Sequence, residues 1–178
     1  MTKPLPPQSF GRWRLPGTSQ RLTKSEVFEI VSATNKKSYA ENAKIEISIG
    51  TDSQPSGEEL CFVTALCVHH TGKGGIYYYT REVIRPPLYI LNNPKLRMLD
   101  EVNKSIHTAV DLREATGLAA TVHIDASPPT SRAFTAQFSE QLKGHVLASG
   151  LECVLKPCSY AANAVADRHT KKKQGCDG

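Results

Sequence analysis

A run of alternating isoleucines in the first third of the chain constrains the fold most. Between Lys44 and Gln54, three isoleucines alternate with polar residues, which is the period of a half-buried β-strand. The run ends on a carboxylate, Asp52, and the stretch 119–127 leads into Asp125 in the same way. A charge just past a buried strand is costly unless it is paired, hydrogen-bonded or bound to a metal. The two carboxylates therefore mark a candidate divalent-metal site.

Apolar periodicity and turn residues predict the other elements. We expect strands over 44–51, 59–70, 75–84, 119–126 and 151–156, and helices that begin after Thr23 and Asn93 and cover about 131–148 and 160–171. Short turns make the first three strands antiparallel neighbours, whereas the later strands alternate with helices and should be parallel. The predicted fold class is α/β, with a mixed five-stranded sheet flanked by helices.

The chain of 178 residues is long enough for one domain with a real core. We expect an extended, basic, Pro-rich arm over 1–21, a single domain over 22–173 and a flexible tail over 174–178. Phe10 and Trp13 should pack the arm against the body of the domain.

Cysteine usage and hydropathy bear on the compartment. No apolar run approaches the length of a membrane span, and the N-terminal residues do not resemble a secretory signal. The five cysteines include no CxxC pair, which favours reduced, buried thiols. We expect a cytoplasmic protein with no membrane partner. The formal charge of +5 and the pI of about 9.0 permit nucleic acid as a partner without requiring it.

Further carboxylates follow from the predicted sheet. Parallel neighbouring strands bring Asp52 and Asp125 to the same carboxyl edge, where open α/β sheets bind ligands. The helix after the third strand offers Asp100 or Glu101, and the longer Glu101 has the greater reach. The last helix offers Asp167. Because the donors are hard oxygens without a Cys/His cluster, they favour Mg²⁺ or Mn²⁺.

Four carboxylates around two metal ions roughly 4 Å apart would form a phosphoryl-transfer site. Candidate substrate-binding residues surround them, namely Ser53, Gln54, Arg132, Lys156 and Arg168. An ion pair is an equal alternative for Arg168, and Ser53 and Gln54 could instead hold Asp52 in place. We interpret His123 as a core residue and the tyrosines at 77–79 as packing residues.

Four segments carry a family resemblance. They are IGTDSQ at 49–54, VHHTGKGG at 68–75, HIDAS at 123–127 with the later Ser131–Arg132, and KPCSYAANAVADRHTK at 156–171. With the order of elements, they resemble the ribonuclease H-like superfamily and, within it, the YkuK-like family, a bacterial family of unassigned function. The resemblance covers about Thr23 to Lys172. It implies acidic residues at the places occupied by Asp52, Glu101, Asp125 and Asp167.

The four carboxylates at one sheet edge predict a divalent-metal-dependent nuclease that acts on RNA or an RNA–DNA hybrid. One departure favours an alternative. Ribonucleases H often have a histidine in the loop before the last acidic residue, whereas this chain has Pro157 to Tyr160 there. The alternative is a non-catalytic nucleic-acid-binding or scaffold protein on the same fold.

Overall fold

A seven-stranded mixed sheet forms the centre of the protein, in the order β2-β1-β5-β4-β3-β6-β7. The computed structural model describes residues 12–170. The strands are β1 (Trp13–Arg14), β2 (Arg21–Leu22), β3 (Ile45–Ser56), β4 (Glu59–His70), β5 (Gly74–Ile84), β6 (Thr121–His123) and β7 (Cys153–Val154). β3, β4 and β5 are antiparallel neighbours, whereas β6 pairs in parallel with β3, and β7 with β6. The predicted mixed α/β sheet is confirmed.

Helices lie in each of the four regions where the sequence predicts them, and a short unpredicted helix, α2, precedes α3. They are α1 (Lys24–Ala40), α2 (Leu88–Leu91), α3 (Pro94–Thr116), α4 (Ala136–Ala148), the π-helical turn η1 (Ala161–Ala166) and α5 (Asp167–Thr170). Thr23 and Glu26 form a capping box at the start of α1, and Asn93 caps α3 ahead of Pro94. Within residues 12–170, no helix is long and apolar enough to cross a membrane.

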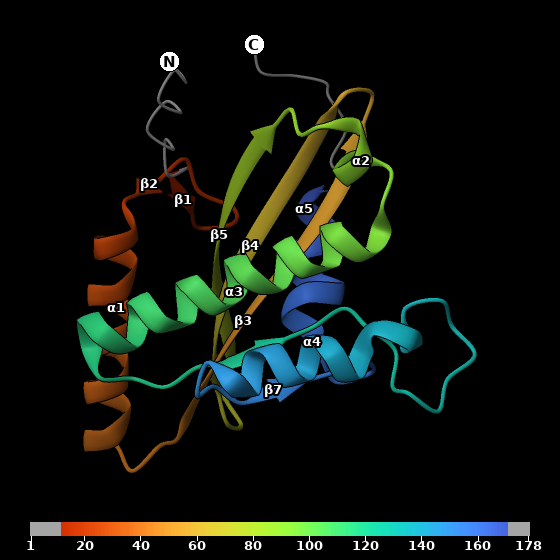
Figure 1. The fold of residues 1–178 in the computed structure, drawn as a ribbon. Helices are drawn as coiled ribbons and strands as arrows, with labels where there is room; N and C mark the ends of the chain where they lie inside the picture. Colours follow the sequence, from red (N-terminus) through yellow and green to blue (C-terminus); the bar gives the residue numbers. More distant parts are fainter. Residues whose placement is uncertain (1–11, 171–178) are drawn as a thin grey trace.

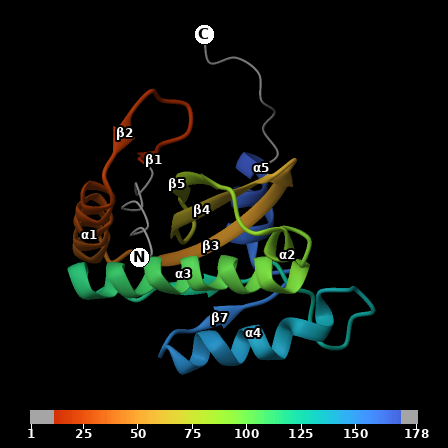
Figure 2. The ribbon, with the colours of Figure 1, turned by 45° about the horizontal axis from the view of Figure 1, so that its top comes forward.

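The helices cover both faces of the sheet (Figure 1). α1, α3 and α4 lie over one face, and α5 lies behind the other (Figure 2). The alternation along β4 matches these two layers. Leu66 and Val68 belong to the core beneath α1 and α3, whereas Val63 and Ala65 pack with the η1 residue Ala161. The middle of β3 and most of β4 are thus buried on both faces, and successive residues there meet the two helical layers in turn.

The prediction of five strands is wrong in detail, because two short strands precede α1. β1 pairs with β2 and, through Arg14, with Tyr79 of β5, so this segment adds to the β5 edge of the sheet. Trp13 is buried, which anchors β1 on the core. Residues 1–11 of the predicted arm, which include Phe10, and the predicted tail at 174–178 lie outside the described residues.

Several predicted boundaries also differ. The strands expected over 119–126 and 151–156 are the shorter β6 (Thr121–His123) and β7 (Cys153–Val154). The helix expected from about Ser131 begins at Ala136, because the preceding residues form turns and Thr135 Oγ1 accepts a hydrogen bond from the Ser127 backbone N–H. β3 does not end at Thr51. It continues to Ser56 because a two-residue turn, with Gly57 at positive φ, keeps the β3–β4 hairpin paired to its end.

Close approach between η1 and β3 depends on one missing side chain. A Cβ added to Gly50 would lie 2.4 Å from the Ala162 backbone N and 2.7 Å from the Ala161 carbonyl carbon. Ala161 and Ala162 are fully buried at this contact. The small residues predicted to let the last helix lie close to the sheet therefore meet a glycine on the strand.

We expect Gly50→Ala to destabilise the protein by about 2–4 kcal/mol, because backbone atoms cannot move aside as a flexible side chain can. The measurement is urea unfolding followed by circular dichroism. Gly144→Ala is the matched control. Gly144 lies inside α4 with nothing within 4 Å of an added Cβ, and alanine there should stabilise by about 0.5–1 kcal/mol. Equal effects at both positions would contradict the steric explanation.

Candidate active site

The end of β6 brings Asp52 and Asp125 to the same level of the sheet. The parallel β3–β6 register ends at Gly50↔His123, and Asp52 and Asp125 each lie two residues beyond that pair. The prediction that Asp52 lies past the end of its strand is wrong, because Asp52 still pairs with Val63 of β4. It lies instead where β3 has passed beyond its pairing with β6.

Asp52 faces the layer formed by η1 and α5. Its Oδ2 accepts a hydrogen bond of 2.6 Å from Thr170 Oγ1, and this α5 residue is itself buried. The pKa of Asp52 is raised to about 6, mainly by burial and also by the charges of Asp167 and Asp125, against the lowering effect of the Thr170 hydrogen bond. Asp52 is therefore held in place, and its carboxyl group takes up a proton at a higher pH than an ordinary aspartate does.

Glu101 reaches the same region from the opposite face of the sheet. Ser53 is next to Asp52 in β3 and therefore points to the α3 layer, where its Oγ donates a 2.5 Å hydrogen bond to Glu101 Oε1. The pKa of Glu101 is raised to about 8, mainly by burial and also by the charges of Asp52 and Asp125, whereas Ser53 and Arg97 lower it. The charge of Asp52 thus acts on Glu101 around the edge of the sheet.

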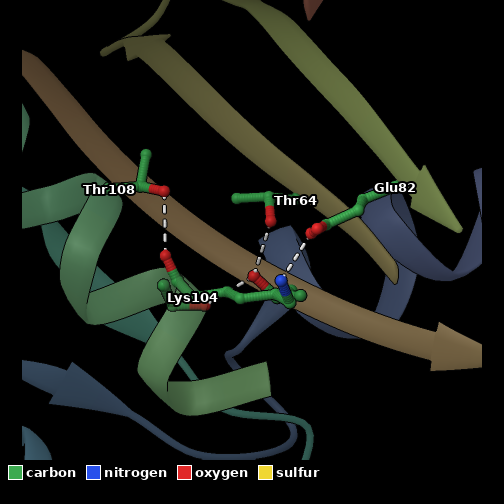
Figure 3. A network of polar contacts seen from close by, with 6 residues as sticks. Thr64, Glu82, Lys104 and Thr108 are labelled. Atoms are coloured by element: carbon green, nitrogen blue, oxygen red, sulfur yellow. Dashed lines mark hydrogen bonds and ion pairs between the residues drawn. The ribbon is translucent and has the colours of Figure 1, made fainter. Parts of the chain in front are cut away.

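A polar network fixes α3 against the sheet and thereby positions Glu101. Ser105 Oγ donates to Thr51 Oγ1 at 2.9 Å, and Thr51 Oγ1 lies 3.0 Å from Thr64 Oγ1 of β4. Lys104 is next to Ser105 on α3, and its Nζ lies 2.5 Å from Glu82 Oε2 (Figure 3). These contacts join α3 to the three central strands.

Asp125 and Asp167 complete the group of four carboxylates. Lys156 Nζ lies 2.6 Å from Asp125 Oδ1, and this buried oxygen has no aligned hydrogen bond. Asp167 begins α5, three residues before Thr170, and acts on Asp52 through its charge. The pKa of Asp100, the alternative to Glu101, is raised by its own burial and lowered by the charge of Lys104. The structure thus brings Glu101, rather than Asp100, into electrostatic contact with Asp52 and Asp125.

The predicted substrate-binding residues fall into two groups. Ser53 and Lys156 make the carboxylate contacts described above, whereas Gln54, Arg132 and Arg168 have exposed side chains. Arg132 was predicted to start a helix, but it lies in the loop between β6 and α4. Its position is therefore set by a loop and not by a helix terminus.

Two residues near the site support the backbone. His123 is buried, and its Nδ1 accepts a 3.1 Å hydrogen bond from the Ala161 backbone N–H, while burial lowers its pKa to about 4. The interpretation of His123 as a core residue is confirmed. His169 stacks on Tyr79 with ring centroids 3.7 Å apart and lies 3.1 Å from Tyr77 Oη, so these tyrosines are packing residues as predicted.

Sequence reasoning missed the role of Thr170 and the partner of Lys156. Thr170 has one faint signal, its spacing of three residues from Asp167, which places both within one turn of a helix. The sequence predicted Lys156 to bind a substrate phosphate and did not predict its contact with Asp125. Its pairing follows from the backbone bond between Lys156 N–H and the Ala126 carbonyl, which no local pattern reveals.

The donor set fits a hard divalent cation. All four groups are carboxylates, Asp125 Oδ1 has no aligned hydrogen bond, and ionising Asp52 and Glu101 together is unfavourable without a compensating cation. Among residues 12–170, however, no three His, Cys, Asp or Glu side chains already converge on a common metal position. Binding would require side-chain rearrangement.

Comparison with known proteins assigns the chain to a family. The model of the family described as Ribonuclease H-like matches residues 26–171. The chain therefore belongs to the ribonuclease H-like family. It is also 28% identical over 167 residues to the uncharacterized protein YkuK of Bacillus subtilis (strain 168), covering 85% of this chain and 92% of that protein. Both findings support the YkuK-like resemblance. No solved structure matches the chain.

We expect the metal-free protein to lose stability as the pH rises from 5 to 9. The folded pKa values of Asp52 and Glu101 exceed their unfolded values, so their contribution to the free energy of unfolding is greatest below about pH 4. It is lost as the pH rises through about 6 for Asp52 and about 8 for Glu101. Glu101→Gln should flatten the upper part of this decline and stabilise the protein by about 1–3 kcal/mol at pH 9. Thermal unfolding in EDTA measures this, with the exposed Glu58→Gln as control. If the stability of Glu101→Gln fell with pH as much as that of wild type, the prediction would be wrong.

We expect Thr170→Val to raise the pKa of Asp52 above about 6, because the hydrogen bond that favours the carboxylate is lost. Carbon-detected NMR titration of the Asp52 carboxyl group provides the measurement. Thr170→Ser keeps the hydroxyl and should leave the pKa within a few tenths. The same value in all three proteins would show that the hydroxyl does not act on Asp52.

Proposed function

We propose that this protein is a Mg²⁺- or Mn²⁺-dependent nuclease that hydrolyses phosphodiester bonds in RNA or an RNA–DNA hybrid. The observation that carries the proposal is the gathering of Asp52, Glu101, Asp125 and Asp167 around the end of β6, with mutual effects on their charges. The ribonuclease H-like fold supports a nuclease-type or nucleic-acid-related function in general.

The four carboxylates would hold the cation or cations. A divalent cation supplies a water of lowered pKa and stabilises the charge that develops on the phosphate, and two such ions can act together. The proposed reaction is in-line displacement, in which a water oxygen forms a new bond to phosphorus while the leaving ester oxygen departs and gains a proton. Ser53 and Thr170 would keep Glu101 and Asp52 oriented throughout.

Substrate would approach along the exposed residues near the site. Gln54 follows the catalytic segment of β3, Arg168 adjoins Asp167 on α5, and Arg132 lies on the loop after Asp125. Their exposure and their three separate elements suit contacts to successive phosphates. One guanidinium group can donate two parallel hydrogen bonds to the oxygens of a phosphate, which favours the two arginines for this role.

We expect Asp52→Asn and Glu101→Gln to reduce the cleavage rate at least about 100-fold, since each removes a charge needed at the reacting centre. The measurement is Mn²⁺-dependent cleavage of labelled single-stranded RNA, duplex RNA and RNA–DNA hybrid, with EDTA abolishing the reaction. Asp100→Asn is the matched control. Asp100 is next to Glu101 on α3, but its pKa is shifted by its own burial and by Lys104 and not by the other carboxylates. It should stay within about threefold of wild type.

Two outcomes would contradict the nuclease proposal. Cleavage that persists unchanged in Asp52→Asn would trace the activity to a contaminant, and no cleavage of any substrate would exclude the activity. Oligonucleotide binding without cleavage, falling steeply with salt concentration, would support the non-catalytic alternative.

A further inference from the structure

Lys156 presents a positive charge where the proposed site needs a cation. It follows β7, and its backbone N–H donates a 3.0 Å hydrogen bond to the Ala126 carbonyl, so the main chain places Lys156 beside Asp125. Its Nζ lies 2.6 Å from Asp125 Oδ1. The side chains of Lys156 and Asp125 are 38% and 24% exposed, so the contact lies at the rim of the site.

The contact acts through charge and not through an aligned hydrogen bond. Asp125 Oδ1 is buried without an aligned hydrogen-bond donor, although the ammonium is close. A metal ion interacts with a carboxylate oxygen in the same manner, as a compact positive charge. Lys156 is thus the ammonium group that balances part of the negative charge of the four carboxylates.

We propose that Lys156 occupies the cation position at Asp125 in the metal-free protein, and that a divalent cation binds Asp125 only by displacing the lysine. The inference rests on the proposed function and adds a competition between a residue of the chain and the metal. A Mg²⁺ or Mn²⁺ ion would lie roughly 2.1 Å from the same oxygen. Two cations this close repel each other strongly in a partly buried site.

The displaced ammonium has a second partner within reach. Lys156 is partly exposed and its stem is flexible, so its Nζ can leave Asp125 and remain at the rim of the site. A phosphate oxygen of a bound nucleic acid would meet it there. Metal binding would therefore release a phosphate-binding group, and by linkage a bound phosphate would favour the metal by the same factor.

We expect Lys156→Met to bind Mn²⁺ at least about tenfold more tightly than wild type, because the competing charge is gone. Isothermal titration calorimetry of the full chain, without nucleic acid, measures this. Lys24→Met is the matched control, since Lys24 Nζ lies 2.5 Å from Asp111 Oδ2 at similar exposure, between α1 and α3. It should stay within about twofold of wild type. Lys156→Gln provides a second variant if Lys156→Met does not fold.

Unchanged or weaker Mn²⁺ affinity in both Lys156 variants would overturn the inference, as would absence of binding in all proteins. A parallel cleavage assay separates this result from the nuclease proposal. Tighter Mn²⁺ binding by the Lys156 variants with no cleavage by wild type would support the competition and reject the nuclease. Cleavage by wild type, together with equal Mn²⁺ affinities of wild type and the Lys156 variants, would support the nuclease and reject the competition.

Discussion

The contact between Gly50 and the backbone of Ala161 and Ala162 determines where the second helical layer lies. A strand and a helix can approach this closely only where neither carries a large side chain, and Gly50 has none. This approach brings the end of η1 over β3, so that the following α5 carries Asp167 and Thr170 to Asp52. His123 reinforces the arrangement from the neighbouring strand by accepting the Ala161 N–H. The proposed site thus depends on a packing contact that contains none of its carboxylates.

The electrostatics of the site follow from the two faces of β3. Asp52 and Ser53 are adjacent and point to opposite layers, so the strand binds α5 through one residue and α3 through the next. Carboxylates from both layers then meet at the edge left when β6 ends. Burial is the main cause that raises the pKa of Asp52 and Glu101, and repulsion between neighbouring carboxylates adds to it, while the Lys156 ammonium lies beside Asp125. A strained arrangement of like charges is common at functional sites, where a ligand supplies the balancing charge.

The sequence predicted the fold class and the four carboxylates more completely than the contacts between them. Alternation along β3 and β4, the capping box at Thr23 and the Pro94 start signal are local patterns, and the structure agrees with them. The alternation of isoleucines did not reveal that β3 continues to Ser56, because its last residues are polar and are held by pairing with β4 across the tight turn. It also did not reveal β1 and β2, which are two residues each and join the sheet only through the pairing of β1 with β5. The Thr170–Asp52 bond joins residues far apart in the chain and arises only once η1 has docked on Gly50. Lys156 was recognised as a residue of the site edge, but its partner depended on the register between its backbone and Ala126.

The length of β3 has a consequence for solubility. The strand continues for six residues beyond Gly50, its last pair with β6, and that side of an extended strand is a surface on which a foreign strand could add. Pro55 lies in this segment and has no N–H to offer such a strand. Asp52, on the same segment, adds a charge that an incoming apolar strand would have to bury. The carboxylate proposed to hold a cation is therefore also a charge of the kind that discourages strand addition at a sheet edge, and a variant that neutralises it would leave Pro55 as the remaining such feature of this segment.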